Sequence, residues 1–138
     1  MERTLILVKP DAMSRQLGGA IIDRLQKSGL KLVGLKMLHM DENLGRRHYA
    51  AHVDKPFFPD LLKYMTSAPI IAAVFEGTGA VEVARKTMGA TNPAKAEPGT
   101  IRRDFGLDIQ QNSVHGSDSP ETAANEIKLF FKDSEMFH

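Results

Sequence analysis

Apolar residues occur along this chain in two patterns, short unbroken runs that predict strands and stripes three or four positions apart that predict helices. The runs predict strands over 4–9, 30–40 and 70–75, and the third is apolar on both faces, as expected of a central strand. A fourth, shorter strand is expected around Val114. Pro10 ends the first run, because proline cannot donate a hydrogen bond to a neighbouring strand.

Helical stripes lie between the strands. The first ends at Gly29 and a later one at Gly89, residues that favour a helix stop, and a polar, helix-like segment covers 41–52. The last helix begins with Ser119 as its N-cap and Pro120 in its first turn. Its predicted apolar stripe is Ala123, Ala124, Ile127, Phe130 and Phe131.

Residues 90–112 break the pattern, since prolines and glycines leave room for at most one helical turn around 101–105. A loop of this length inside a folded domain is commonly functional. The order of elements predicts one domain over 1–138 with an α/β (α+β sandwich) architecture. We expect a ferredoxin-like four-stranded antiparallel sheet with helices packed on it.

Composition narrows the classes of function. The chain has 138 residues, 42% of them hydrophobic, which is enough for one domain to fold without a metal or disulfide. The absence of cysteine excludes thiol catalysis and cysteine zinc sites. A net charge of +1 gives no electrostatic case for a dedicated nucleic-acid or membrane surface. No signal peptide or spanning segment is recognisable, so a cytoplasmic location is expected.

Two of the five histidines have a spacing known from zinc sites. His48 and His52 are four residues apart, but Tyr49 stands where such a helix carries its general-base glutamate. We therefore interpret them as two histidines on an exposed helix and predict no metal site in the protein.

His115 lies in a more suggestive setting, the run Asn-Ser-Val-His-Gly-Ser-Asp-Ser over 112–119. Gly116 allows another group to approach the ring closely. Glu126 borders the apolar stripe of the following helix, where a carboxylate near a histidine can fix its tautomer and raise its nucleophilicity. The alternative is that Glu126 only flanks the helix and that 117–119 only cap it.

Cationic residues elsewhere in the chain suit a polyphosphate. Arg85 and Arg102 offer bidentate forks and Lys9 a point charge at the end of the first strand. There is no Walker-type loop, and the single Asp-Phe-Gly at 104–106 lacks the other protein-kinase motifs.

Together these residues resemble those of nucleoside diphosphate kinase. The resemblance runs from about Arg3 to Phe131, and its most specific part is the run over 112–119. The other matching segments are 9–11, Tyr49, 55–58, 91–93 and 98–102. The resemblance implies a ping-pong transfer in which His115 takes the γ-phosphoryl group of a nucleoside triphosphate and passes it to a nucleoside diphosphate, with little base selectivity.

The resemblance also implies which side chains take part. The catalytic group would be His115, Glu126, Tyr49 and Ser117. The nucleotide-binding group would be Lys9, Phe57, Arg85, Thr91, Arg102, Asn112 and Ile109. In this group the arginines and the threonine would hold phosphates, and the lysine and asparagine would contact the ribose hydroxyls and the terminal phosphate. The aromatic ring would stack on the base, with the isoleucine against its other face.

Mg²⁺ would arrive with the nucleotide phosphates, and the chain would form a homo-oligomer, a tetramer or hexamer, with a dimer also open. Two other classes remain at this stage. An RNA-recognition module would need exposed aromatics on its central strands, where only Phe75 is available. A phosphocarrier that accepts phosphate at His115 from a protein partner would not need the nucleotide-binding group.

Overall fold

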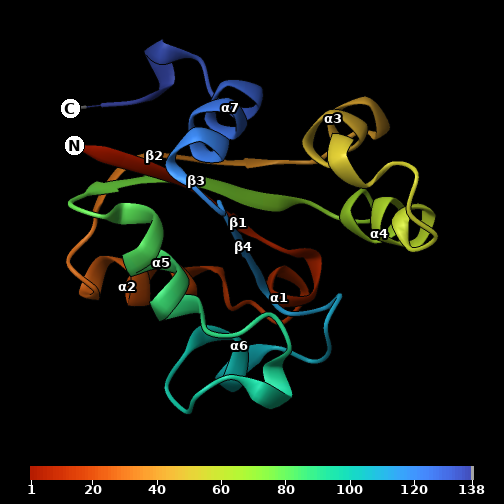
Figure 1. Ribbon diagram of the computed structural model, residues 1–138, viewed down its shortest axis with the longest axis horizontal. Helices are drawn as coiled ribbons and strands as arrows, with labels where there is room; N and C mark the ends of the chain where they lie inside the picture. Colours follow the sequence, from red (N-terminus) through yellow and green to blue (C-terminus); the bar gives the residue numbers. More distant parts are fainter. Residues whose placement is uncertain (138) are drawn as a thin grey trace.

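One antiparallel sheet organises the chain, with its strands in the order β2-β3-β1-β4 (Figure 1). The computed structural model describes residues 1–137, so His138, the last residue of the predicted domain, lies outside it. The strands are β1 (Glu2–Val8), β2 (Lys31–Leu38), β3 (Ile70–Gly77) and β4 (Val114–Gly116). β1 pairs with β3 and β4, and β2 pairs with β3. The predicted fold class is confirmed, and the strand predicted to be central is internal to the sheet.

Both faces of the sheet are covered, which explains why β1 is an unbroken apolar run. Leu5 and Leu7 belong to the core on one face, Ile6 and Val8 to the core on the other, and all four are fully buried. The first core packs against α4 (Phe58–Met65) and α7 (Pro120–Phe130), with α3 (Glu42–His48) beside them. The second packs against α2 (Gly18–Lys27), α5 (Ala80–Met88) and α6 (Ile101–Phe105), on the opposite side of the sheet in Figure 1.

The remaining elements are short. They are α1 (Pro10–Ser14), directly after β1, and the 3₁₀ turns η1 (Ala50–His52), η2 (Pro93–Lys95) and η3 (Asp133–Glu135). The irregular stretch 90–112 therefore holds η2 and the single helical turn predicted at 101–105. No helix among residues 1–137 is long and apolar enough to cross a membrane.

Two expectations about helices were wrong. The segment 41–52 is not one helix, because α3 ends at His48 and a separate 3₁₀ turn carries His52. In α7, Ala124 is exposed, whereas Glu126 is buried beside Ile127. The buried face of α7 therefore includes position 126 and not position 124.

The predicted N-cap fixes the start of α7. The Ser119 hydroxyl accepts a hydrogen bond from the Thr122 N–H at 3.1 Å, a contact that is typically worth about 1 kcal/mol. Ile127 and Phe130 then anchor the helix in the core of the sheet face. The cap and these contacts together set the direction in which Glu126 projects.

Candidate active site

One cavity of about 510 Å³ collects the residues that the sequence singled out. All of the predicted site residues line it except Ser117, which is fully buried behind it. They come from the ends of β1 and α3, from the residue before α4, from α5, from the stretch 90–112, and from β4 and α7. Residues more than a hundred positions apart are thus brought together at one end of the sheet.

His115 is held on β4 opposite Leu7 of β1, and its side chain is 23% exposed. Its Nε2 lies 3.3 and 3.2 Å from the two carboxylate oxygens of Glu126. Because a carboxylate only accepts hydrogen bonds, the neutral ring carries its proton on Nε2. The lone pair on Nδ1 is then free to attack an electrophile.

Glu126 has a second partner that fixes it in place. The Ser117 hydroxyl donates to its Oε1 at 2.7 Å, and the same hydroxyl accepts the Leu5 N–H at 3.2 Å. Burial alone would raise the pKa of Glu126, but the hydrogen bonds from His115 and Ser117 outweigh it and hold that pKa below its usual range. The side chain is therefore an ionised carboxylate at neutral pH, tied to the sheet through Ser117.

Lys9 and Asn112 form a linked pair that lines the same cavity. The Lys9 ammonium donates to the Gln110 carbonyl at 2.7 Å and to the Asn112 side-chain oxygen at 2.9 Å. The Asn112 amide in turn donates to the Thr91 carbonyl at 3.0 Å. Burial, reinforced by the charge of Arg102, lowers the pKa of Lys9 from 10.5 to about 8.

The two arginines differ in how firmly they are held. Arg102 is buried and donates to the carbonyls of Gly89 at 3.0 Å and Val114 at 2.9 Å, and burial together with the charge of Arg85 lowers its pKa to about 10. Arg85 is 43% exposed and pairs only loosely with its surroundings, through Asp118 at 2.9 Å. An entering anion therefore meets Arg102, which is fixed, and Arg85, which can leave Asp118 and pair with the anion instead.

The lining of the cavity includes two exposed apolar side chains. Phe57 is 49% exposed and Ile109 is 60% exposed, although both line the cavity. Two exposed apolar side chains of this kind can hold a flat ring between them. Together with the buried cations, they give the cavity an apolar outer end and a cationic inner end.

The chain is similar to known proteins over nearly its whole length. A sequence model of the nucleoside diphosphate kinase family matches residues 2–136. The nucleoside diphosphate kinase of Dehalococcoides mccartyi is 60% identical over 136 residues, which cover 99% of this chain and 96% of the relative. The chain belongs to the nucleoside diphosphate kinase family.

Solved structures agree with this assignment. A nucleoside diphosphate kinase from Aquifex aeolicus superposes with a TM-score of 0.96 at 40% identity, covering 99% of both chains. A halophilic member from Halobacterium salinarum, solved in complex with CDP, gives a TM-score of 0.96 at 47% identity, with 99% of this chain and 91% of that chain covered.

Asp11 does not line the cavity, but it supports the turn that precedes His115, a role that the sequence analysis did not predict. Its buried carboxylate accepts hydrogen bonds from the Ser113 N–H at 3.3 Å, from the Ser113 hydroxyl at 3.0 Å and from the Tyr64 hydroxyl, and it pairs with Arg15 at 3.1 Å. Ser113 has φ 75°, a left-handed conformation that costs a serine on the order of 1 kcal/mol. The carboxylate thus holds a strained turn two residues before His115.

The prediction that His48 lies on an exposed helix face was wrong. Its side chain is only 1% exposed and lies beside Glu126, because α7 packs over the end of α3. Tyr49, predicted near the reacting group, is half-buried and lines the cavity, and burial raises its pKa. Burial, with a smaller contribution from His115, lowers the pKa of His48 to about 3, so its ring is neutral at pH 7. Both His48 and His52 were predicted to be exposed, and this is confirmed for His52 alone.

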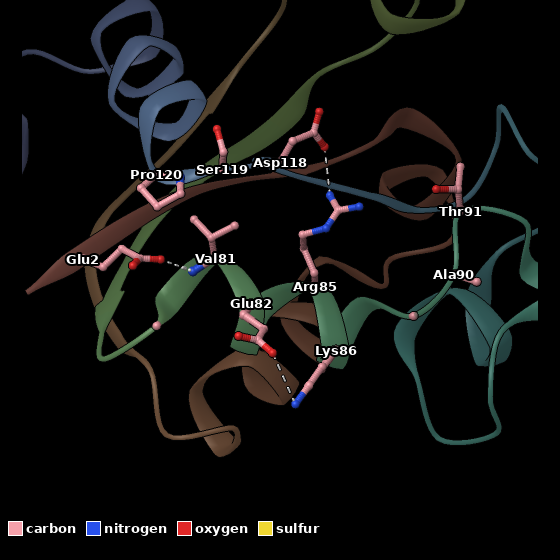
Figure 2. A pocket seen from close by; sticks show the side chains of 12 residues that line it. Glu2, Val81, Glu82, Arg85, Lys86, Ala90, Thr91, Asp118, Ser119 and Pro120 are labelled. Carbon is pink, nitrogen blue, oxygen red and sulfur yellow. Dashed lines mark hydrogen bonds and ion pairs between the residues drawn. The ribbon is translucent and has the colours of Figure 1, made fainter.

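A second, larger cavity of about 780 Å³ adjoins the first across the Arg85–Asp118 ion pair (Figure 2). It is lined by α5 and the start of α7, where Glu2 accepts the Val81 N–H at 2.9 Å. His115 does not line it. The smaller cavity holds the predicted catalytic histidine, and the two cavities share Arg85, Thr91 and Asp118 at their boundary.

Proposed function

We propose that His115 carries the phosphoryl group between two nucleotides, with Nδ1 as the attacking atom. The overall reaction follows from family membership: the chain transfers the γ-phosphoryl group of a nucleoside triphosphate to a nucleoside diphosphate. The observation that supports the histidine as intermediate is the Glu126 carboxylate on Nε2, at 3.2 Å, which leaves the Nδ1 lone pair free.

In the first half-reaction Nδ1 forms a bond to the γ-phosphorus while the bond from that phosphorus to the bridging β-oxygen breaks. The diphosphate leaves with the bonding electrons. Positive charge develops on the ring as Nδ1 donates its lone pair, and the adjacent carboxylate of Glu126 stabilises it. The second half-reaction reverses these steps with a different diphosphate, which accepts the phosphoryl group and restores neutral His115.

The phosphates would lie between the cations at the inner end of the cavity. Arg102 is pre-positioned by two carbonyl contacts, so it loses little conformational freedom when it meets the transferring group. Arg85 would leave Asp118 and join it, and Thr91 would add a hydroxyl donor. The proposed nucleotide pose places Lys9 and Asn112 against the ribose and the terminal phosphate, and Tyr49 near the transferred group.

We also propose that the nucleotide enters as its Mg²⁺ complex. Mg²⁺ is commonly held by substrate phosphates with only one or two carboxylates from the protein. In the part of the chain that the structure describes, the carboxylates lining the cavity are those of Asp118 and Glu126, and Glu126 is already bonded. The site therefore fits an ion carried mainly by the phosphates, with Asp118 able to approach it. Such an ion neutralises phosphate charge.

The apolar side chains at the outer end of the cavity explain why different bases should be accepted. Phe57 and Ile109 offer contact with either face of a ring and no hydrogen bonds to its edge, so purines and pyrimidines should both bind. The Halobacterium salinarum relative was solved with CDP. For this chain we propose that no strong preference exists among the four common ribonucleotides.

The other two classes fit less well. Helices cover both faces of the sheet, so β1 and β3 offer no open face for stacking nucleic-acid bases. A phosphocarrier needs no apolar mouth beside its histidine, yet Phe57 and Ile109 line the cavity. The cytoplasmic location remains a prediction.

A homo-oligomer is proposed from the outer strand. β2 lies at an edge of the sheet and exposes Leu35 to 51% and Met37 to 64%. An exposed apolar edge strand is a surface that commonly pairs with another chain. We propose that a second copy covers it within a tetramer or hexamer. Light scattering coupled to size-exclusion chromatography would measure the mass, and a monomer at micromolar concentration would contradict the proposal.

The test of the histidine intermediate separates these functions. Protein incubated with ATP and Mg²⁺ should gain one phosphoryl group per chain, measured by intact mass under alkaline conditions, and should form GTP when GDP is added. His115→Ala should gain none and lose turnover, while His39→Ala, an exposed histidine that follows the opposite edge strand β2, should behave as wild type. Full activity with phosphate retained on another residue would refute the assignment.

A further inference from the structure

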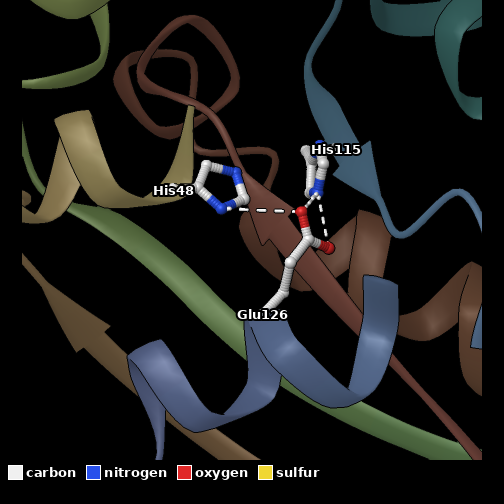
Figure 3. A group of neighbouring side chains, drawn as sticks. All are labelled: His48, His115 and Glu126. Carbon is white, nitrogen blue, oxygen red and sulfur yellow. Dashed lines mark hydrogen bonds and ion pairs between the residues drawn. The ribbon is translucent and has the colours of Figure 1, made fainter. Parts of the chain in front are cut away.

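Three side chains that commonly ligate metals converge beside the reacting nitrogen: His48 from α3, His115 from β4 and Glu126 from α7 (Figure 3). Their ligand atoms all lie within 4.8 Å of one another. The rings of the two histidines are nearly perpendicular, with centroids 4.8 Å apart, and both face the carboxylate in Figure 3. The reaction proposed above uses Glu126 and His115 but leaves His48 without a task.

His48 is unusual because both of its ring nitrogens are buried and have no hydrogen-bond partner. Its side chain is 1% exposed, and its Nδ1 stops 3.6 Å from the Glu126 oxygen Oε2, beyond hydrogen-bond distance. Leaving a buried polar group without a partner costs about 1–3 kcal/mol. When the neutral His48 ring carries its one proton on Nε2, the lone pair of Nδ1 points toward the carboxylate and can bind a ligand between them.

The separations suit a zinc ion. A tetrahedral Zn²⁺ with bonds of about 2.0–2.1 Å keeps neighbouring ligand atoms roughly 3.3 Å apart. The His115 Nε2 lies 3.2 Å from Glu126 Oε2, and the His48 Nδ1 lies 3.6 Å from the same atom. Only the distance between the two histidines has to shorten, by a side-chain rotation.

The surroundings favour an ion that binds by strong bonds rather than by charge alone. Lys9, Arg85 and Arg102 line the same cavity and repel any free cation. Mg²⁺ prefers six oxygen ligands and gains little from imidazoles, whereas two histidines and one glutamate are a ligand set that Zn²⁺ uses in proteins. The cluster should therefore distinguish zinc from the magnesium that accompanies the nucleotide.

We propose that Zn²⁺ binds across His48, Glu126 and His115, with water as its fourth ligand, and that this binding reversibly masks the nucleophile. The binding is a property of the three side chains and does not depend on the reaction. The masking rests on the proposed role of Nδ1 of His115.

Masking follows from where the ring proton must go. Zinc binds through the lone pair of His115 Nε2. The proton with which Nε2 donated a hydrogen bond to Glu126 must therefore leave that nitrogen. The neutral ring then holds this proton on Nδ1, which it reaches through solvent, and no proton is gained or lost overall. Protonated Nδ1 has no lone pair for phosphorus, and the Glu126 carboxylate has exchanged its hydrogen bond for a metal bond.

Binding is tested first, with Zn²⁺ alone and the full chain free of nucleotide. Calorimetry should show one Zn²⁺ per chain, and Co²⁺ used as a substitute should give the visible absorption of a four-coordinate site. His48→Gln and Glu126→Gln remove one ligand each, and each should weaken binding by at least about tenfold. His39→Gln is the matched control on an exposed histidine and should leave the affinity unchanged.

Activity is then measured with excess Mg²⁺ at free Zn²⁺ fixed by a metal buffer. The wild-type rate should fall at least about tenfold at saturating zinc, whereas His48→Gln should keep most of its own zinc-free rate at the same concentration. No stoichiometric binding, or equal affinity in His48→Gln, would overturn the site, and bound zinc with an undiminished rate would overturn the masking. A chain inactive without zinc would contradict the proposed function while leaving the binding result intact.

Discussion

Glu126→Gln is the substitution that most directly tests how the cavity activates its histidine. The carboxylate accepts two hydrogen bonds at once, from Ser117 at 2.7 Å and from His115 Nε2 at 3.2–3.3 Å. A glutamine has the same shape but only one oxygen. If that oxygen still accepts the hydrogen bond from Ser117, the amide NH₂ faces Nε2 of His115. The NH₂ only donates hydrogen bonds, so it favours the tautomer in which Nε2 is unprotonated.

The expected loss can be worked from these contacts. Replacing a hydrogen bond to a charged group by a neutral one forfeits up to about 1.5–3 kcal/mol. At about 1.36 kcal/mol per factor of ten, this slows transfer by about 10- to 150-fold. Where the amide also reverses the tautomer and protonates Nδ1, the loss should approach a thousandfold, since a histidine held in the wrong tautomer cannot act. We expect a reduction between tenfold and a thousandfold, smaller than that of His115→Ala.

Rapid-quench measurement of a single phosphorylation by ATP isolates this step from product release. The rate constant should fall, while the dissociation constant for ADP stays within about twofold, because Glu126 does not touch the nucleotide in the proposed pose. Glu121→Gln makes the same change on the exposed face of α7 and should leave both constants unchanged. An unaltered single-turnover rate in Glu126→Gln would show that Glu126 only flanks its helix.

Three further predictions concern the parts that hold the site. Asp11→Asn leaves Arg15 without a counter-ion and weakens the contacts to Ser113, so urea unfolding should show a loss of about 1–3 kcal/mol, which exposed Asp54→Asn should not show. The pKa of Lys9 is about 8 when folded and 10.5 otherwise, so the unfolded chain binds more protons between these values. Stability from this group therefore rises across that window, while KM for ADP should also rise as the cation is lost, and Lys9→Gln should abolish this pH dependence. Specificity constants for ADP, GDP, CDP and UDP should agree within roughly a hundredfold, and loss of the 3′-hydroxyl should cost more than any base change, so a thousandfold base preference in steady-state kinetics would contradict the stacking site.

The fold was largely predictable because each strand and helix carries its own periodic signal. The unbroken runs of β1 and β3 reflect burial on both faces, and the cap at Ser119 is visible in the sequence alone. Much of the site was also accessible, because segments such as 112–119 carry several of its residues within a few positions. The strand order then places β4, which carries His115, beside β1, which leads to Lys9.

What the sequence did not reveal are contacts made between elements. The segment 41–52 is short and polar, so its pattern favours an exposed helix, and nothing in it shows that α7 covers His48. Asp11 was missed for a related reason. Its partners Ser113 and Tyr64 are 102 and 53 positions away, and its effect is exerted on a backbone conformation that no local pattern records.

The two ends of the cavity differ in rigidity, and this difference bears on what the chain has to recognise. At the inner end Lys9, Arg102 and Asn112 are all buried, and each is fixed by two or more hydrogen bonds before any ligand arrives. Fixed donors of this kind stabilise a transition state at little reorganisation cost, but only for a group whose position never varies. The phosphates and the ribose meet that condition in every nucleotide. The base does not, and in the proposed pose it lies between Phe57 and Ile109, where no polar contact would be lost by exchanging one base for another. Precise chemistry and broad substrate choice are therefore compatible in one cavity because they depend on different ends of it.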